Sequence, residues 1–174
     1  MVGWGANARA FAEQLRQMQA QVLVYSEHAT DADLRGSGAI PASLSQVLAA
    51  DIVSLHRGLT ERSRHCLGAA ELAKLRSGAV LINVARGALI EPNALLARLR
   101  RGDIFACLDS FEDEPLPASH PLRDLPNVFL TAHIAGGSSD NYAAAALEVV
   151  RNVAALLAGD PAQHIGADRL RTMS

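Results

Sequence analysis

The chain of 174 residues carries 16 Lys and Arg against 18 Asp and Glu, which gives a formal net charge of −2. This near-neutral balance argues against a nucleic-acid or membrane partner, because both favour a basic surface. No uncharged apolar run approaches the roughly 20 residues of a membrane span, and Cys66 and Cys107 fit no zinc spacing. We therefore predict a cytoplasmic protein without a metal site.

Short apolar runs alternate with helical segments along the chain. The predicted strands lie at residues 22–25, 52–55, 79–82, 104–108 and 128–130, and we expect them to be buried on both faces. The predicted helices lie at residues 8–15, 43–50, 69–75, 92–101 and 139–158. This alternation predicts a Rossmann-like α/β fold with a doubly wound, mainly parallel sheet. Only Met1 and Val2 precede the first glycine, so we expect a truncated first strand.

The segment from Gly3 to Ala8 has the form G-x-G-x-x-A. In such a turn the first glycine allows a tight bend, and the second lets the backbone approach a pyrophosphate. The N-terminus of the following helix supplies N–H groups for the phosphates. We therefore predict that a dinucleotide binds at Gly3, Gly5, Ala6 and Asn7.

An acidic residue about 20 positions after this turn commonly binds the ribose hydroxyls of NAD. Ser26 stands at that position and Glu27 follows it, so both are candidate cofactor ligands. Glu27 fits either a ribose contact or a solvated loop acid. No arginine occurs at residues 26–30 to hold a 2′-phosphate, which favours NAD over NADP.

Three later blocks each place a charged or titratable residue just after a predicted strand. They contain Arg86, then Asp109 and Glu114, then His133. The carboxyl ends of the strands are where open α/β sheets bind ligands. Each residue alone has an ordinary structural explanation, but their order beside a dinucleotide turn indicates one site. The long, proline-rich loop from residue 110 to 127 is also typical of a functional segment.

With these blocks the chain resembles the D-isomer-specific 2-hydroxyacid dehydrogenase family from Gly3 to about Gly159. The motifs that carry the resemblance are Ser54-Leu55-His56, Thr60, Asn83-Val84-Ala85-Arg86-Gly87-Ala88-Leu89-Ile90, the spacing of Asp109 and Glu114, and His133-Ile134-Ala135-Gly136. The resemblance implies that Arg86 binds substrate, that His133 is the acid–base residue and that Glu114 is its partner. It also implies cofactor contacts at His56, Thr60, Val84, Ala85, Arg86, Asp109, His133 and Gly136.

The implied activity is hydride transfer between NAD(H) and a small 2-hydroxy or 2-oxo acid, in a homodimer. One feature departs from the family pattern, and another limits the choice of substrate. Arg57-Gly58 replaces the usual apolar residue and proline after His56, and Glu114 argues against formate as the substrate. An alternative is a non-enzymatic NAD-binding regulatory module, since corepressors that resemble this family keep the same residues. A methyltransferase would leave the blocks around Arg86 and His133 without a role.

We expect a dinucleotide-binding domain over residues 1–159 and a C-terminal tail over residues 160–174. In the family, such a tail returns to a substrate domain whose main part precedes the glycine turn. We therefore expect that this chain lacks most of that domain. Alone, it should bind NAD(H) weakly and turn over 2-oxo acids poorly, because orientation of the substrate supplies much of the rate enhancement.

Overall fold

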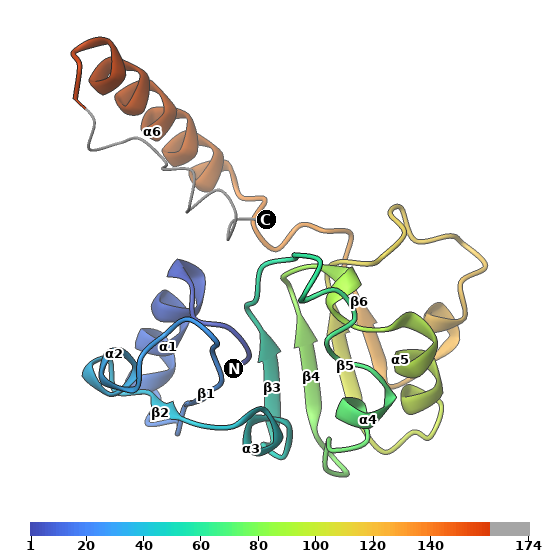
Figure 1. The fold of residues 1–174 in the computed structure, drawn as a ribbon. Coiled ribbons are helices and arrows are strands. Elements are labelled where there is room, and N and C mark those ends of the chain that lie inside the picture. Colours follow the sequence, from blue (N-terminus) through green and yellow to red (C-terminus); the bar gives the residue numbers. More distant parts are fainter. Residues whose placement is uncertain (161–174) are drawn as a thin grey trace. The chain divides into compact units, whose positions relative to one another are not determined.

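The computed structural model describes residues 1–160 and shows an α/β fold (Figure 1). The chain divides into two compact units, Met1–Ala132 and a second that begins at His133. The predicted tail lies outside the described residues apart from Asp160, and the predicted domain boundary at residue 159 stays a prediction. No helix in the described part of the chain is both long and apolar enough for a membrane span.

The first unit contains all of the strands. Its elements are α1 (Ala6–Gln17), β1 (Leu23–Val24), α2 (Asp31–Gly36), β2 (Ile40–Pro41), α3 (Leu44–Leu48), β3 (Ile52–Leu55), α4 (Ala69–Leu72), β4 (Val80–Asn83), the 3-10 turn η1 (Gly87–Leu89), α5 (Pro92–Leu99), β5 (Phe105–Leu108), the 3-10 turn η2 (Pro121–Asp124) and β6 (Val128–Leu130). The second unit contains α6 (Ser139–Leu157). All five predicted strands and all five predicted helices are present, several of them shorter than expected, whereas α2 and β2 were not predicted.

Local sequence signals explain where several helices begin. Ser43 caps α3 by accepting from the Gln46 N–H, and the Gln46 side chain accepts from the Ser43 N–H in return. Glu91 accepts from two N–H groups at the start of α5, where Pro92 occupies the first turn. Ser138 caps α6 by accepting from the Asn141 N–H.

A single residue, Val2, links two parallel sheets, and together their strands follow the order of a doubly wound fold. β1 pairs with β2, and β3, β4, β5 and β6 pair in that order, all in parallel. Val2 forms parallel bridges with both Tyr25 and Leu55 and so occupies the central position between β1 and β3. Its N–H donates to the Ser54 carbonyl at 2.9 Å, and its carbonyl accepts from the His56 N–H at 2.7 Å. The first strand is therefore reduced to this single bridging residue, as expected from the two residues that precede Gly3.

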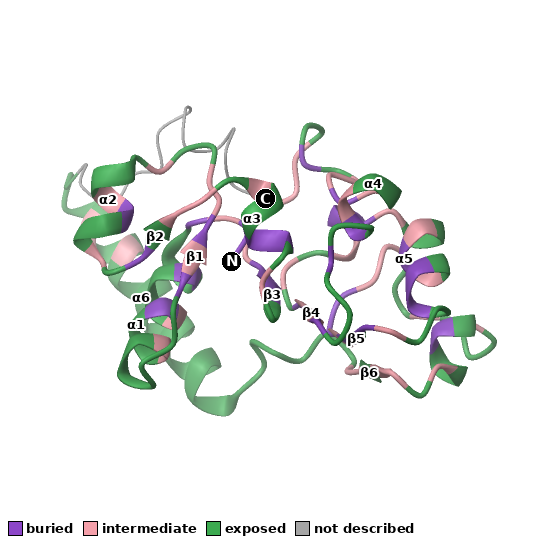
Figure 2. Cartoon of the chain, turned by 90° about the horizontal axis from the view of Figure 1, so that it is seen from below, coloured by how far each residue is buried: buried purple, intermediate pink, exposed green. Residues whose placement is uncertain are grey.

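The buried side chains form two clusters. The larger surrounds β3, β4 and β5 and includes residues from α3, α4 and α5 (Figure 2). The smaller lies around α1 and β1 and consists of Met1, Trp4, Ala8, Ala12, Val22, Val24, Leu34 and Ala39. Val2 belongs to the larger cluster although it borders the smaller one along the chain.

The expectation that the strands are buried on both faces is wrong for the four-stranded sheet. Ile52, Phe105 and Phe129 are 59%, 53% and 65% exposed. Ile52 and Phe105 flank Val80 in register, so these three side chains form a row on one face. Helices α4 and α5 pack with the buried residues of the opposite face. In the first unit the sheet is therefore covered on one side and partly open on the other.

Candidate functional site

The glycine turn joins the bridging residue Val2 to helix α1, as predicted. Gly3 has φ of +99°, and a Cβ built on it would lie 2.6 Å from the carbonyl carbon of His56. Gly5 is the N-cap of α1, where no side chain caps the helix and no atom lies within 4 Å of an added Cβ. The turn therefore packs against the backbone after β3 and leaves open space at an uncapped helix N-terminus. Such a cradle fits a pyrophosphate.

Ser26 stabilises the turn that follows β1. Its Oγ accepts from the N–H groups of His28 at 3.3 Å and Ala29 at 3.1 Å. The predicted ribose position thus carries a neutral hydroxyl whose oxygen is engaged by the backbone.

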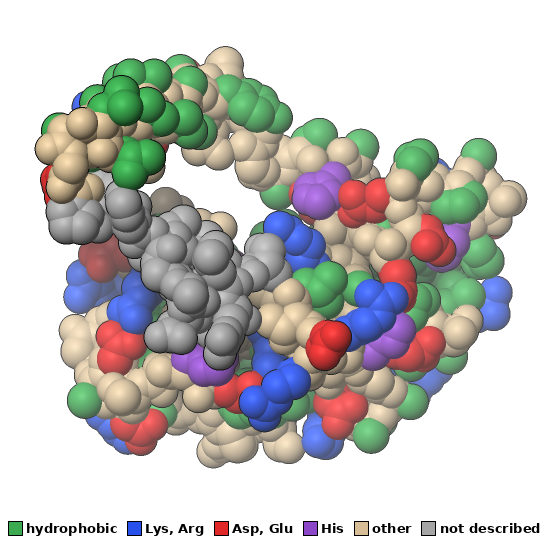
Figure 3. Space-filling model, turned by 45° about the horizontal axis from the view of Figure 1, so that its top comes forward, with side chains coloured by type: hydrophobic (Ala, Val, Ile, Leu, Met, Phe, Trp, Pro, Cys, Tyr) green, Lys and Arg blue, Asp and Glu red, His purple; other side chains and the backbone are tan. Residues whose placement is uncertain are grey.

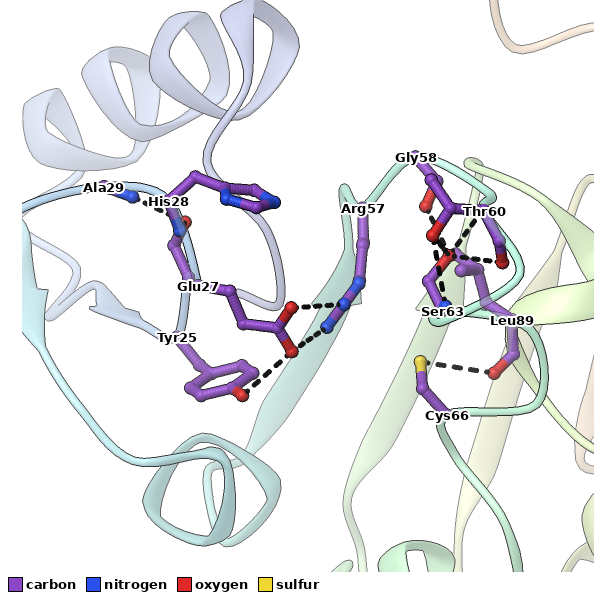
Figure 4. Close-up of polar contacts among 11 residues, drawn as sticks. Tyr25, Glu27, His28, Ala29, Arg57, Gly58, Thr60, Ser63, Cys66 and Leu89 are labelled. Carbon is purple, nitrogen blue, oxygen red and sulfur yellow. Dashed lines mark hydrogen bonds and ion pairs between the residues drawn. The ribbon is translucent and has the colours of Figure 1, made fainter. Parts of the chain in front are cut away.

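Glu27, the other predicted ribose ligand, forms an ion pair that the sequence analysis did not predict. Arg57 donates from Nη1 and Nη2 to the two carboxylate oxygens of Glu27 at 2.9 and 2.7 Å (Figure 4). The Tyr25 hydroxyl donates to the same carboxylate at 3.3 Å. The Arg57 guanidinium is the main reason that the pKa of Glu27 is lowered from its ordinary value. Glu27 is therefore not a simple solvated loop acid.

His56 and Thr60 lie in the segment that follows β3. The Nε2 atom of His56 lies 2.9 Å from the Ser54 hydroxyl, and its ring is tilted beside Phe11. Burial, aided by the N-terminal ammonium group, lowers the pKa of His56 to about 4, so the ring is neutral at pH 7. The N–H of Thr60 donates to the hydroxyl of buried Ser63 at 2.7 Å, which fixes this turn.

Asn83 organises the loop that carries Arg86. Its side-chain amide donates to the Arg86 carbonyl at 2.9 Å and accepts from the Ala85 N–H at 3.1 Å. Asn83 is buried, whereas Val84 and Arg86 are exposed. This arrangement places the Arg86 guanidinium in solvent directly after β4, with Nη1 donating to the Ala85 carbonyl.

The loop after β5 carries the two predicted acidic residues. Asp109 is buried, and its carboxylate accepts from the Thr131 hydroxyl at 2.5 Å. Glu114 is exposed and accepts from the Phe111 N–H at 2.9 Å. A Cβ built on Gly87 would lie 1.9 Å from the carbonyl carbon of Phe111. The structure therefore brings the loop of Arg86 into direct backbone contact with the loop of Glu114.

His133 and Gly136 lie in the second unit, three and six residues after β6. His133 has a positive φ of 55°, which is uncommon for a residue with a side chain. The Gly136 carbonyl accepts from the Asn141 side chain at 2.8 Å, close to the start of α6. The pairing of Glu114 with His133 would join the two units and stays a prediction.

A second charged cluster lies beside the Glu114 loop and was missed by the sequence analysis. The Nε2 atom of His65 lies 2.8 Å from Glu112, whose other carboxylate oxygen pairs with Arg64. Figure 3 shows acidic, basic and histidine side chains together on the face that carries the carboxyl ends of the strands. Among the described residues no group of His, Cys, Asp and Glu has a metal-binding arrangement.

Comparison with known sequences points to one family. Residues 1–135 match the family model described as "D-isomer specific 2-hydroxyacid dehydrogenase, NAD binding domain". The chain is 36% identical over 163 residues to a glyoxylate reductase of Thermofilum pendens. This alignment covers 92% of this chain and 48% of that protein. It is 45% identical over 104 residues to glyoxylate/hydroxypyruvate reductase B of Citrobacter koseri, covering 58% of this chain and 32% of that protein. The chain thus spans about a third to a half of these curated relatives.

Solved structures agree with the sequence comparison. A D-lactate dehydrogenase from Lactobacillus jensenii, solved with NAD⁺, has a TM-score of 0.83 and 28% identity, over 95% of this chain and 54% of that one. A protein from Thermus thermophilus has a TM-score of 0.79 and 34% identity, over 91% and 50% of the two chains. These likenesses extend over nearly the whole chain.

Proposed function

Since the chain belongs to the D-isomer specific 2-hydroxyacid dehydrogenase family, whose NAD-binding domain it contains, we propose that it is the cofactor half of a 2-oxo acid reductase. The observation that carries this proposal is the uncapped, open N-terminus of α1 at Gly5, on the sheet edge where the Arg86 and Asp109 loops also lie. The names of the relatives favour a small substrate such as glyoxylate or hydroxypyruvate.

Three side chains have proposed roles at the substrate. When bound, NADH supplies the hydride that reduces the carbonyl carbon of the 2-oxo acid. The planar fork of Arg86 suits the carboxylate and carbonyl oxygens of such a substrate. His133 donates a proton to the carbonyl oxygen as it becomes a hydroxyl group, and takes one up in the reverse reaction. Glu114 orients the imidazole and stabilises its cationic form.

The remaining predicted residues have proposed roles at the cofactor. Backbone groups of Val84 and Ala85 line the nicotinamide, and Asp109 orients its carboxamide, held in place by Thr131. His56, which is neutral at pH 7, contributes a hydrogen-bonding ring without adding charge. Thr60 and Gly136 complete the predicted set of contacts.

We also propose that residues 1–159 act as one dinucleotide-binding domain within a homodimer. Equilibrium sedimentation tests the dimer. A monomer at all concentrations would reject it, without affecting the proposed chemistry.

The test of the proposed function has two steps. First, this chain should bind NADH, measured by quenching of Trp4 fluorescence. Second, the whole polypeptide that carries the chain in its host should oxidise NADH when glyoxylate or hydroxypyruvate is added. His133→Asn should lower kcat by about 100-fold or more, the scale of lost acid–base catalysis, and Arg86→Gln should mainly raise KM.

Arg76→Gln is the matched control, because Arg76 pairs with Asp51 at the amino end of β3, away from the site. Its kinetics should equal those of the unaltered protein. NADH binding without reduction of any 2-oxo acid would favour the regulatory module instead. Failure to bind NADH would reject both functions.

A further inference from the structure

The ion pair at the ribose end of the site bears on which dinucleotide this chain accepts. In an NAD-selective site, an acidic residue accepts hydrogen bonds from the ribose hydroxyls, and its negative charge repels a 2′-phosphate. Here both carboxylate oxygens of Glu27 are bound by the two terminal nitrogens of Arg57. We propose that Arg57 determines the cofactor preference of this chain, because its pairing with Glu27 neutralises the acid and lets the site accept NADPH as well as NADH. This inference rests on the dinucleotide site proposed above.

Burial strengthens this pair relative to an ordinary surface ion pair. The side chain of Arg57 is 18% exposed and that of Glu27 is 34% exposed. Fully exposed pairs are screened by water and salt, whereas partly buried pairs with two hydrogen bonds are screened less. The bidentate geometry also fixes the guanidinium in one orientation. Arg57 is therefore an ordered part of the site.

The position of Arg57 places it between two parts of the predicted cofactor site. Its backbone nitrogen lies 2.7 Å from the Cβ position built on Gly3, so the residue begins beside the glycine turn. Its side chain ends at Glu27, after β1 (Figure 4). The ribose of a dinucleotide bound at the turn lies between these two places. Arg57 thus extends along the region that the ribose and any 2′-phosphate would occupy.

The charges around Glu27 also favour an anion. After Arg57, the positive charge of Arg62 makes a smaller contribution to lowering the pKa of Glu27. Ser26 carries no charge, and its hydroxyl oxygen accepts two backbone N–H groups. The ribose end of the site therefore has no unpaired negative charge among these residues.

The same two residues can serve both cofactors. With NADH, Glu27 accepts from the 2′-hydroxyl group through a free lone pair while it remains bound to Arg57. With NADPH, the guanidinium keeps its pair with the Glu27 carboxylate and donates its remaining N–H groups to the 2′-phosphate, since it carries five N–H donors.

The test measures the affinities of the full chain for NADH and NADPH at one fixed, low ionic strength. Arg57→Gln should weaken NADPH binding by about tenfold or more, the loss expected for one charge-assisted hydrogen-bonded contact, and should change NADH affinity by less than about threefold. Glu27→Gln frees Arg57 and should strengthen NADPH binding relative to NADH. Arg76→Gln, which removes the arginine of a surface pair at the other end of β3, should change neither affinity.

A second variant keeps the test decisive if Arg57→Gln does not fold. Arg57→Lys retains the positive charge but loses the fork, so NADPH affinity should lie between those of the unaltered chain and Arg57→Gln. Equal losses for both cofactors, or no change in either, would overturn the inference. Exclusion of NADPH by the unaltered chain, with NADH still bound, would overturn it as well. If neither dinucleotide binds, the proposed function itself fails.

Discussion

The two glycines of the dinucleotide turn are under different constraints. Replacing each by alanine should therefore have different effects. Gly3→Ala should lower the free energy of unfolding by about 1–3 kcal/mol or more, because the residue has a positive φ and the added Cβ meets the His56 backbone. Gly5→Ala should cost less than about 1 kcal/mol, since its Cβ meets no atom. NADH affinity should nevertheless fall about tenfold or more, because the methyl group would occupy the space proposed for the pyrophosphate.

Urea unfolding and NADH titration measure both effects. The unaltered chain is the reference, and circular dichroism confirms that each variant keeps its helices. Full NADH affinity in Gly5→Ala would show that the pyrophosphate does not bind at this turn.

The buried ring of His56 should make stability depend on pH in mildly acidic solution. Its pKa is lowered from 6.5 to about 4 in the folded chain, so below pH 6.5 the unfolded chain binds more protons. The contribution of His56 is therefore constant above pH 6.5. It declines as the pH falls toward 4, by at most about 3 kcal/mol in total.

Unfolding by urea at pH 7 and pH 4.5 measures this decline. His56→Gln should reduce it, because glutamine keeps a polar side chain but does not titrate. An equal decline in both proteins would assign the pH dependence to other groups.

At the scale of residues, the sequence identifies the parts that follow local rules. The spacing of Gly3 and Gly5 and the position of Arg86 after a strand require only the order of residues along the chain. The pairing of Glu27 with Arg57 could not be predicted in this way, because 30 positions separate the two residues. Residues 26–30 contain no arginine, and the guanidinium comes instead from the segment that follows β3.

At the scale of elements, a mutation can test the contact between the Arg86 loop and the Glu114 loop. A Cβ on Gly87 would lie 1.9 Å from the carbonyl carbon of Phe111 and 2.3 Å from its oxygen. Gly87→Ala should therefore displace the Glu114 loop and lower the free energy of unfolding by about 1–3 kcal/mol or more. Thermal unfolding measures the loss.

Gly36→Ala is the matched control, because Gly36 lies in α2 and its Cβ would meet no atom within 4 Å. It should be neutral or stabilising by up to about 1 kcal/mol. Equal stability of the two variants would mean that the loops separate without cost.

Elements were predicted where periodicity was strong and missed where it was short. β2 has only two residues, Ile40 and Pro41, and α2 has six with a single buried side chain, Leu34. Neither gives a periodic pattern long enough to be identified. The burial of the strands was predicted incorrectly. An apolar run shows that the side chains of a strand are apolar, but it does not show whether helices cover one face of the sheet or both. Phe105 and Phe129 show the difference.

At the scale of the whole molecule, the first unit consists of two halves of unequal packing. The smaller cluster has eight buried residues, of which three are alanines, whereas the larger has eighteen, most of them leucine, isoleucine or valine. Burial of apolar area is the main stabilising contribution, so α1, β1 and β2 gain less from packing than β3 to β6. The two sheets are joined at Val2, whose backbone bonds to Ser54 and His56 on the β3 side, while its neighbours Met1 and Gly3 bond to Tyr25 after β1.

This difference predicts that the two halves open with different free energies, and that NADH raises the opening free energy of both. In the free chain, the Ile40 amide donates to the residue before β1 and the Ala42 amide donates to β1 itself. Both amides should exchange with solvent at a lower opening free energy than those of Val80 and Ala106. In the proposed binding mode, a dinucleotide at Gly5 and Glu27 that extends toward Asp109 would contact both halves. At 100 times its dissociation constant it stabilises the bound state by about 2.7 kcal/mol. Because opening of either half breaks the site, that gain should appear at all four amides, and the difference between the halves should remain. Hydrogen exchange followed by NMR, with and without NADH, measures each amide. Equal protection of all four amides in the free chain would show that Val2 couples the halves into one cooperative unit.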